Sequence, residues 1–135
     1  MSCNSSIIEY IISRGGNDYF SLIESASTYG KFRIVMKYWD KLTKNYVQLN
    51  QSILYNAFNN VHLGMIKFLV ERRLVNQNQL QNSLKDLKNS LKELKSRHRR
   101  LHEATEYKGK TYKLEAMDKQ IVASDSIIAY LRYRV

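Results

Sequence analysis

The feature that most constrains the fold of this 135-residue chain is a leucine repeat in its second half. The leucines recur at alternating steps of four and three residues, at Leu80, Leu84, Leu87, Leu91, Leu94 and Leu101. His98 stands at the one step where a leucine is missing. Heptad spacing of this kind places the leucines on one narrow stripe of a long α-helix. Such a stripe is stable in water only when another helix covers it, so the sequence predicts a coiled-coil pairing.

A second apolar repeat supplies a partner within the chain. Between residues 112 and 135 the same spacing recurs, with Ser124 at its missing step, at Leu114, Met117, Ile121, Ile128 and Leu131. Gly109 lies between the two repeats and supplies a turn. The sequence therefore predicts an antiparallel helical hairpin. Two alternatives stay open: residues 106–114 form a small β-hairpin at the tip, or the leucine stripe pairs with a second copy of the chain in a homo-oligomer.

The first half shows a different pattern, of short helices separated by compact turns. The chain contains no proline and only five glycines, so few residues force a helix to end. The amide-rich step Asn76–Gln79 separates the two patterns. The sequence predicts an all-α fold in two parts, with helical repeats in residues 1–78 and a basic antiparallel coiled-coil hairpin in residues 79–135.

An internal repeat underlies the first half. Three segments, 7–18, 30–42 and 62–73, each begin with apolar residues, continue to an aromatic residue and end in polar residues. A further helical segment precedes the second and the third of them, at 19–30 and 51–62. Repetition of a helical pair at such a spacing is typical of solenoid proteins.

The third copy resembles the ankyrin repeat, a unit of about 33 residues made of a turn and two antiparallel helices. Residues 62–71 read His-Leu-Gly-Met-Ile-Lys-Phe-Leu-Val-Glu, which follows the family's Gly-His-Leu-Glu-Ile-Val-Lys-Tyr-Leu-Leu-Glu from its histidine onward. The second copy keeps the family's small and apolar positions at Ala26, Gly30, Phe32, Ile34 and Val35. The chain is similar to the degenerate ankyrin proteins of large DNA viruses.

The sequence also departs from the ankyrin pattern. The family's Thr-Pro-Leu-His signature is absent, and Ser21–Glu24 and Ser52–Tyr55 stand in its place. Val61 occupies the position of the glycine between the two helices of a repeat. A stack of so few repeats exposes apolar faces at its ends, so we expect the helical hairpin to cap it.

The resemblance implies protein–protein recognition, because ankyrin proteins bind partners through their turn tips and the exposed face of each first helix. Carried onto this sequence, the partner-binding residues are Asn17, Asp18, Tyr19, Glu24, Thr28, Tyr29, Tyr46, Tyr55, Asn59 and Asn60. Tyrosine and asparagine suit this role, since aromatic rings give contact area at low entropic cost and amides adapt their hydrogen bonds.

The net charge of +10 indicates an affinity for polyanions or acidic protein surfaces. Basic residues recur beside the leucine stripe at steps of three and four. The candidate polyanion-binding residues are Lys85, Lys88, Lys92, Lys95, Arg97, Arg99 and Arg100. Three interpretations stay open: an acidic protein partner, a nucleic-acid backbone, or lysine stems that cover the leucines while their charges stay in water.

Motifs for catalysis or cofactor binding are weak in this sequence. His98 and His102 have a spacing that suits a metal, but the arginines around them disfavour a dication. Residues 109–111 read Gly-Lys-Thr but lack the earlier glycine and the strand of a phosphate-binding loop. Cys3, the single cysteine, has no neighbouring histidine to activate it. The sequence therefore predicts a non-enzymatic protein without metal or cofactor.

Targeting signals are also missing from the sequence. The N-terminal residues lack the basic start and apolar run of a signal peptide, and no segment approaches 18 consecutive apolar residues. We expect an intracellular protein, in a host-cell cytoplasm or a virion, that does not enter a membrane. The favoured function is a protein–protein adaptor. The alternatives are sequence-independent nucleic-acid binding through Lys85–Arg100 and a structural role in a viral particle.

Overall fold

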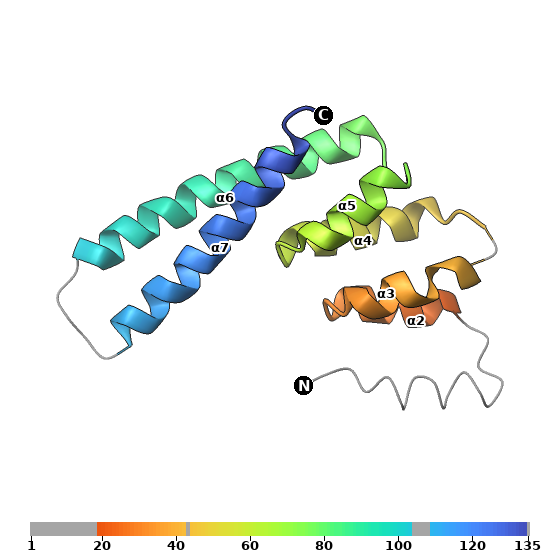
Figure 1. Cartoon of the computed structure of the whole chain (residues 1–135), viewed down its shortest axis with the longest axis horizontal. Coiled ribbons are helices and arrows are strands. Elements are labelled where there is room, and N and C mark those ends of the chain that lie inside the picture. The colour runs from red at the N-terminus through yellow and green to blue at the C-terminus, as the bar shows by residue number, and fades with distance from the viewer. Residues whose placement is uncertain (1–18, 43, 104–108, 135) are drawn as a thin grey trace. The chain divides into compact units, whose positions relative to one another are not determined.

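The computed structural model describes residues 19–42, 44–103 and 109–134, and its secondary structure is helical. In chain order the helices are α2 (Tyr19–Thr28), α3 (Phe32–Tyr38), the short 3-10 helix η1 (Trp39–Lys41), α4 (Val47–Asn59), α5 (Leu63–Glu71), α6 (Gln77–Glu103) and α7 (Lys110–Leu131) (Figure 1). The prediction of an all-α fold is confirmed. The predicted repeat segment at residues 7–18 lies outside the described residues.

The chain divides into two compact units. The first, which we call the repeat unit, contains the residues up to Asn60 together with Gly64–Val75. The second, which we call the hairpin unit, contains Val61–Leu63 together with the residues from Asn76 onward. The repeat unit therefore holds α2, α3, η1, α4 and most of α5, and the hairpin unit holds α6 and α7.

The two helix pairs of the first half bury the same positions. In α2 and α3 the buried residues include Ile23, Ala26, Ser27, Ile34 and Val35. The same places in α4 and α5 are taken by the buried residues Leu54, Ala57, Phe58, Met65 and Ile66. Each helix thus turns one apolar stripe inward, and alanine recurs in both first helices. The repeat seen in the sequence therefore corresponds to residues that are buried at equivalent positions in the two helix pairs.

The turns within the two helix pairs also correspond. After α2, Gly30 has a left-handed φ of 70°, its amide donates to Ser27 O at 3.0 Å, and the next amide donates to Ala26 O at 2.7 Å. These bonds form the common glycine cap of a helix C-terminus. After α4, Val61 holds the equivalent place with a φ of 51°. The second turn therefore keeps the left-handed conformation of the first without its glycine. This conformation is strained for Val61, because valine is β-branched.

The first helices of the two pairs are parallel neighbours. Near their beginnings the rings of Phe20 and Tyr46 meet edge to face at 4.8 Å. Near their ends Asn56 Nδ2 donates a hydrogen bond to Ser27 Oγ at 3.0 Å. Because both ends are in contact, residues at equivalent places of α2 and α4 face the same side of the repeat unit.

The hairpin unit has the predicted antiparallel arrangement. Helices α6 and α7 lie side by side and run in opposite directions (Figure 1). Gln77 Nε2 donates to Arg134 O at 2.9 Å, which joins the beginning of α6 to the end of α7. Nearer the tip, Lys95 Nζ lies 3.8 Å from Asp125 Oδ1. The alternative β-hairpin at residues 106–114 is absent from its described part, because α7 begins at Lys110.

A capping box starts α6. Gln79 N donates to Asn76 Oδ1 at 2.9 Å, and Asn76 N donates to Gln79 Oε1 at 2.8 Å. These reciprocal bonds satisfy amides that the first turn of a helix leaves without a partner. The amide-rich step in the sequence is therefore the defined start of the long helix as well as the boundary between two patterns.

Burial of the seam residues in the hairpin unit falls from its open end toward its tip, although Lys110 at the beginning of α7 is itself buried. The buried residues of the seam are Leu80, Leu87, Leu91, Ser124, Ile127 and Leu131. Closer to the tip the seam residues are only half-buried, at Leu94, Leu101, Leu114, Met117 and Ile121. Ile127 is buried where the heptad spacing selected its neighbour Ile128, which is half-buried. The two isoleucines are adjacent, and both fit the average helical spacing to within one residue. The spacing alone therefore does not tell which of the two is more deeply buried.

Candidate interaction surfaces

The repeat unit exposes a row of residues on α2 and α4. Glu24, Thr28 and Tyr29 hold the same places in the first helix pair as Tyr55, Asn59 and Asn60 hold in the second. All six are exposed, and α2 and α4 are parallel neighbours, so the row is continuous. We call these six residues the tyrosine surface. It contains six of the ten residues that the sequence predicted for partner binding.

Two aromatic rings are exposed on the tyrosine surface. Tyr29 is 77% exposed and Tyr55 is 66% exposed. Two of their four polar neighbours have side-chain bonds within the chain. Thr28 Oγ1 donates to Glu24 O at 3.0 Å, and Asn60 Nδ2 donates to Asn56 O at 2.8 Å. Exposed rings beside satisfied polar groups offer contact area that a partner can bury at low entropic cost.

The remaining predicted partner-binding residues have other roles or lie elsewhere. Tyr19 is half-buried and its ring stacks on Tyr38 at 6.0 Å. Tyr46 is half-buried and packs on Phe20. These two tyrosines hold helices of the repeat unit together, and a pattern of residue types does not distinguish a packed ring from an exposed one. Asn17 and Asp18 lie outside the described residues.

The seven predicted polyanion-binding residues are all exposed on α6. Two of them have acidic neighbours. Lys95 approaches Asp125 at 3.8 Å, and Arg97 Nη2 donates to Glu93 Oε1 at 2.6 Å. The hydrogen bond and charge of Arg97, with the charge of Arg100, hold the pKa of the Glu93 carboxyl below its usual value.

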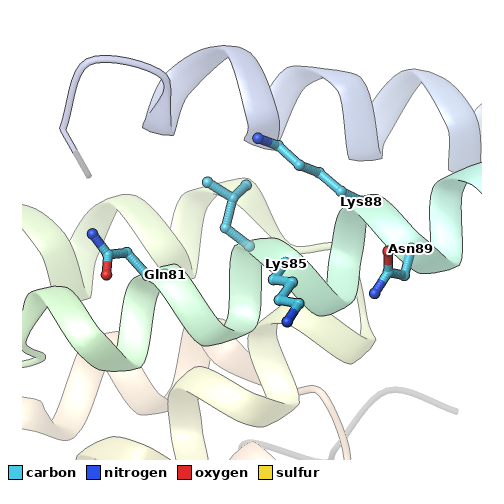
Figure 2. A pocket seen from close by; sticks show the side chains of 5 residues that line it. Gln81, Lys85, Lys88 and Asn89 are labelled. Carbon is cyan, nitrogen blue, oxygen red and sulfur yellow. The ribbon is translucent and has the colours of Figure 1, made fainter.

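The other part of this basic row has no acidic partner. Within the described part of the chain, no ion pair is formed by Lys85, Lys88, Lys92 or Arg99. Lys85 and Lys88 border a surface hollow of about 270 Å³, which Gln81, Leu84 and Asn89 also line (Figure 2). We call these five residues the α6 hollow.

The side chains around the α6 hollow diverge. In Figure 2 the side chain of Lys88 extends toward α7, and that of Lys85 extends away from it. Leu84 is half-buried, while the four polar residues are exposed. Sequence reasoning selected the two lysines and missed Gln81 and Asn89. The signal was present, because steps of four residues place Gln81, Lys85 and Asn89 on one face of a helix.

His98 faces an acid across the hairpin instead of a metal. Its Nε2 lies 2.8 Å from Asp118 Oδ1, and the pair is ionic only when the imidazole is protonated. The ring of His102 stacks on it at 6.4 Å. Among the described residues no group of three metal-ligating side chains occurs. The polar residue in the leucine stripe therefore has a partner on α7, consistent with a role in register.

Sequence reasoning also missed a buried polar cluster in the repeat unit. Asn50 is 1% exposed, and its Nδ2 donates to Asn45 Oδ1 at 2.7 Å and to Leu74 O at 3.2 Å. Asn45 and Leu74 also line a surface hollow of about 300 Å³ beside Trp39. These bonds join the beginning of α4 to the segment after α5. The cluster therefore organises the backbone, and Asn50 itself is inaccessible to a ligand.

Comparison of the chain with protein-family models, with curated proteins and with solved structures gives no match. Within residues 19–42, 44–103 and 109–134, no helix is long and apolar enough to cross a membrane. The function must therefore be argued from the two exposed surfaces, one aromatic and one basic.

Proposed function

We propose that this chain is a non-enzymatic protein–protein interaction module of the adaptor type. The observation that supports this proposal is the tyrosine surface, where Tyr29 in the turn after α2 and Tyr55 on the neighbouring α4 are 77% and 66% exposed. Interface centres are enriched in tyrosine, since a ring gives a large contact area and fixes only two side-chain torsions.

The build of the repeat unit supports the same proposal. Its two helix pairs repeat one pattern of burial, and a left-handed residue follows the first helix of each pair, at Gly30 and at Val61 on the boundary with the hairpin unit. Repeated helix pairs form rigid, extended surfaces, and the resemblance to the degenerate ankyrin proteins of large DNA viruses suggests that this surface binds a host or assembly partner. Rigidity matters here because residues that are ordered before binding lose little entropy on binding.

The proposal is tested by selecting displayed random peptides on the immobilised chain. We expect peptides enriched on the native chain to lose binding to the double variant Tyr29→Ala/Tyr55→Ala. The matched control is Tyr112→Ala/Tyr133→Ala, which removes two rings that are 76% and 88% exposed on the hairpin unit. Peptides that bind all three chains equally, or no enrichment at all, would contradict the proposal.

The competing function is sequence-independent nucleic-acid binding along α6. The observation that favours it is the row Lys85, Lys88, Lys92 and Arg99, which has no acidic partner among the described residues. Fluorescence anisotropy of labelled duplex DNA and RNA at two salt concentrations tests it. Tight binding that weakens steeply with salt and disappears in Lys85→Glu/Lys88→Glu/Lys92→Glu would establish this function instead.

A further inference from the structure

The α6 hollow combines an apolar floor with cationic sides. Leu84 belongs to the leucine stripe but is only half-buried, whereas Leu80 and Leu87 on either side of it are 4% and 7% exposed. The hollow measures about 270 Å³, just below the range of about 300–1,000 Å³ that is typical of small-molecule sites. Its size suits one aliphatic side chain of a partner rather than a cofactor.

The charge around the α6 hollow is uncompensated. Neither Lys85 nor Lys88 forms an ion pair with a described residue. Two acids of α7 have basic partners elsewhere on α6, because Asp118 approaches His98 and Asp125 approaches Lys95. The segment opposite the beginning of α6 carries arginine instead, because Gln77 Nε2 donates to the carbonyl of Arg134. An acidic group from outside the hairpin would therefore find both lysines without an ion-pair partner, although the exposed Asp86 lies beside Lys85 on the same helix.

The mixture of groups favours a protein segment over a nucleic acid. A duplex presents phosphates for the lysines but no aliphatic group to cover Leu84. A single strand would need aromatic rings to stack its bases, and α6 contains no phenylalanine, tyrosine or tryptophan in its 27 residues. The side-chain amides of Gln81 and Asn89 both donate and accept, which suits polar groups of a polypeptide.

We propose that the α6 hollow binds an acidic amphipathic segment of a partner protein. An aliphatic side chain of that segment covers Leu84, and its flanking carboxylates pair with Lys85 and Lys88. A helical partner matches this arrangement. Carboxylates three or four residues apart on a helix are separated along its axis by about the same distance as Lys85 and Lys88 on α6. This inference rests on the proposed function as an interaction module and names a second surface with its own partner chemistry.

The test is a fluorescence-anisotropy titration with a labelled synthetic helix. The probe has leucine at its seam positions and glutamate at the flanking positions, and a control peptide has glutamine in place of glutamate. We expect Lys85→Gln/Lys88→Gln to weaken binding of the acidic peptide about tenfold, since each exposed ion pair contributes up to about fivefold.

The control variant Arg33→Gln/Lys119→Gln removes the same total charge from exposed positions outside the hollow and outside the basic row of α6. It should weaken binding less than about twofold, and the glutamine peptide should not bind. Equal weakening by both double variants, equal binding of both peptides, or no binding of the acidic peptide would overturn the inference. Binding of labelled duplex DNA that depends on Lys85 and Lys88, without peptide binding, would assign the face to nucleic acid and overturn it too.

The two proposals fail separately. The peptide selection with the Tyr29→Ala/Tyr55→Ala variant concerns only the tyrosine surface, and the titration concerns only the α6 hollow. If the selection succeeds and the titration fails, the chain is an interaction module without an acidic partner at α6. If both fail, the proposed function falls with the inference. Circular dichroism of each variant confirms that the helices are intact before either measurement.

Discussion

The repeat unit and the hairpin unit bury their apolar residues in different ways. In the repeat unit Ile23, Val35, Ile53 and Leu69 are all 0% exposed and come from four different helices. In the hairpin unit the apolar residues form a single seam between two helices, and near the tip that seam is half-buried. A helix in a stack has neighbours on several sides, whereas each helix of a hairpin has one.

This difference explains where each unit places its candidate surface. Helices of the repeat unit bury apolar residues against several neighbours, and Tyr29 and Tyr55 lie among the residues that stay exposed. The hairpin helices need only a narrow stripe, so most of α6 faces water and carries charge. The aromatic surface and the basic surface are thus consequences of how much of each helix its neighbours cover.

The largest expected effect is that of a charge placed in the hairpin seam. Leu87→Asp puts a carboxylate at a position that is 7% exposed and has no basic partner within the seam. We expect the hairpin unit to lose most of its helical signal, measured by far-ultraviolet circular dichroism. Trp39, the only tryptophan, lies in the repeat unit, so its fluorescence reports that unit separately. A variant with unchanged helicity would show that Leu87 does not lie in the seam.

A matched pair of leucine truncations compares the two units directly. Leu69→Ala empties a completely buried site in the repeat unit and should lower the free energy of unfolding by about 2–5 kcal/mol. Leu94→Ala acts at a half-buried place in the hairpin unit and should cost about 1 kcal/mol, because much of that side chain already contacts water. Denaturant titrations of both variants provide the measurement. Equal losses would mean that the hairpin seam is packed as densely as the repeat unit.

Opposite substitutions at the two left-handed turns, one removing a glycine and one introducing a glycine, should have opposite effects on stability. Gly30→Ala should lower the free energy of unfolding by about 1–2 kcal/mol, since φ is 70° there and a Cβ would lie 3.1 Å from Asn60 Oδ1. Val61→Gly should raise it by less than about 1 kcal/mol, because relief of the strained φ of 51° is partly offset by lost burial of the valine. Thermal unfolding of both variants checks these signs. A destabilised Val61→Gly would mean that the valine side chain matters more than its backbone strain.

The smallest effect concerns Glu93, a carboxyl whose pKa is shifted. The hydrogen bond from Arg97 keeps the pKa of Glu93 below the ordinary value of 4.5, so its ionised form is favoured in the folded chain. The stabilisation is present above pH 4.5 and is lost as the pH falls through the lower folded pKa. In Arg97→Gln the pKa of Glu93 should rise, which a nuclear magnetic resonance titration of that carboxyl measures. An unchanged pKa would mean that the ion pair does not form in solution.

Much of the fold followed from periodicity alone. The leucine stripe predicted α6, and the second repeat of the same spacing predicted α7 and its antiparallel direction. These features are local, because the heptad period depends only on the geometry of one helix. The buried residues Met65, Ile66 and Leu69 of α5 fall within residues 62–71, the segment that carries the clearest repeat pattern in the sequence.

Features that depend on contacts distant in sequence were missed. The burial of Asn50 depends on Leu74 after α5, and the packing of Tyr19 depends on Tyr38 in another helix. Residue type gives no signal for either outcome, since asparagine and tyrosine are common both in packed clusters and on binding surfaces. The sequence predicted only part of the α6 hollow. Its two lysines were recognised by their charge, whereas the uncharged amides Gln81 and Asn89 were missed.

The capping box of Asn76 and Gln79 has a consequence for the behaviour of α6 in different solutions. Most such boxes use a glutamate, but here both side chains are amides without a titratable group. Acid, alkali and added salt change the charged middle of α6 and leave these two hydrogen bonds intact. The beginning of the helix therefore stays capped under conditions that change the charge of its basic face.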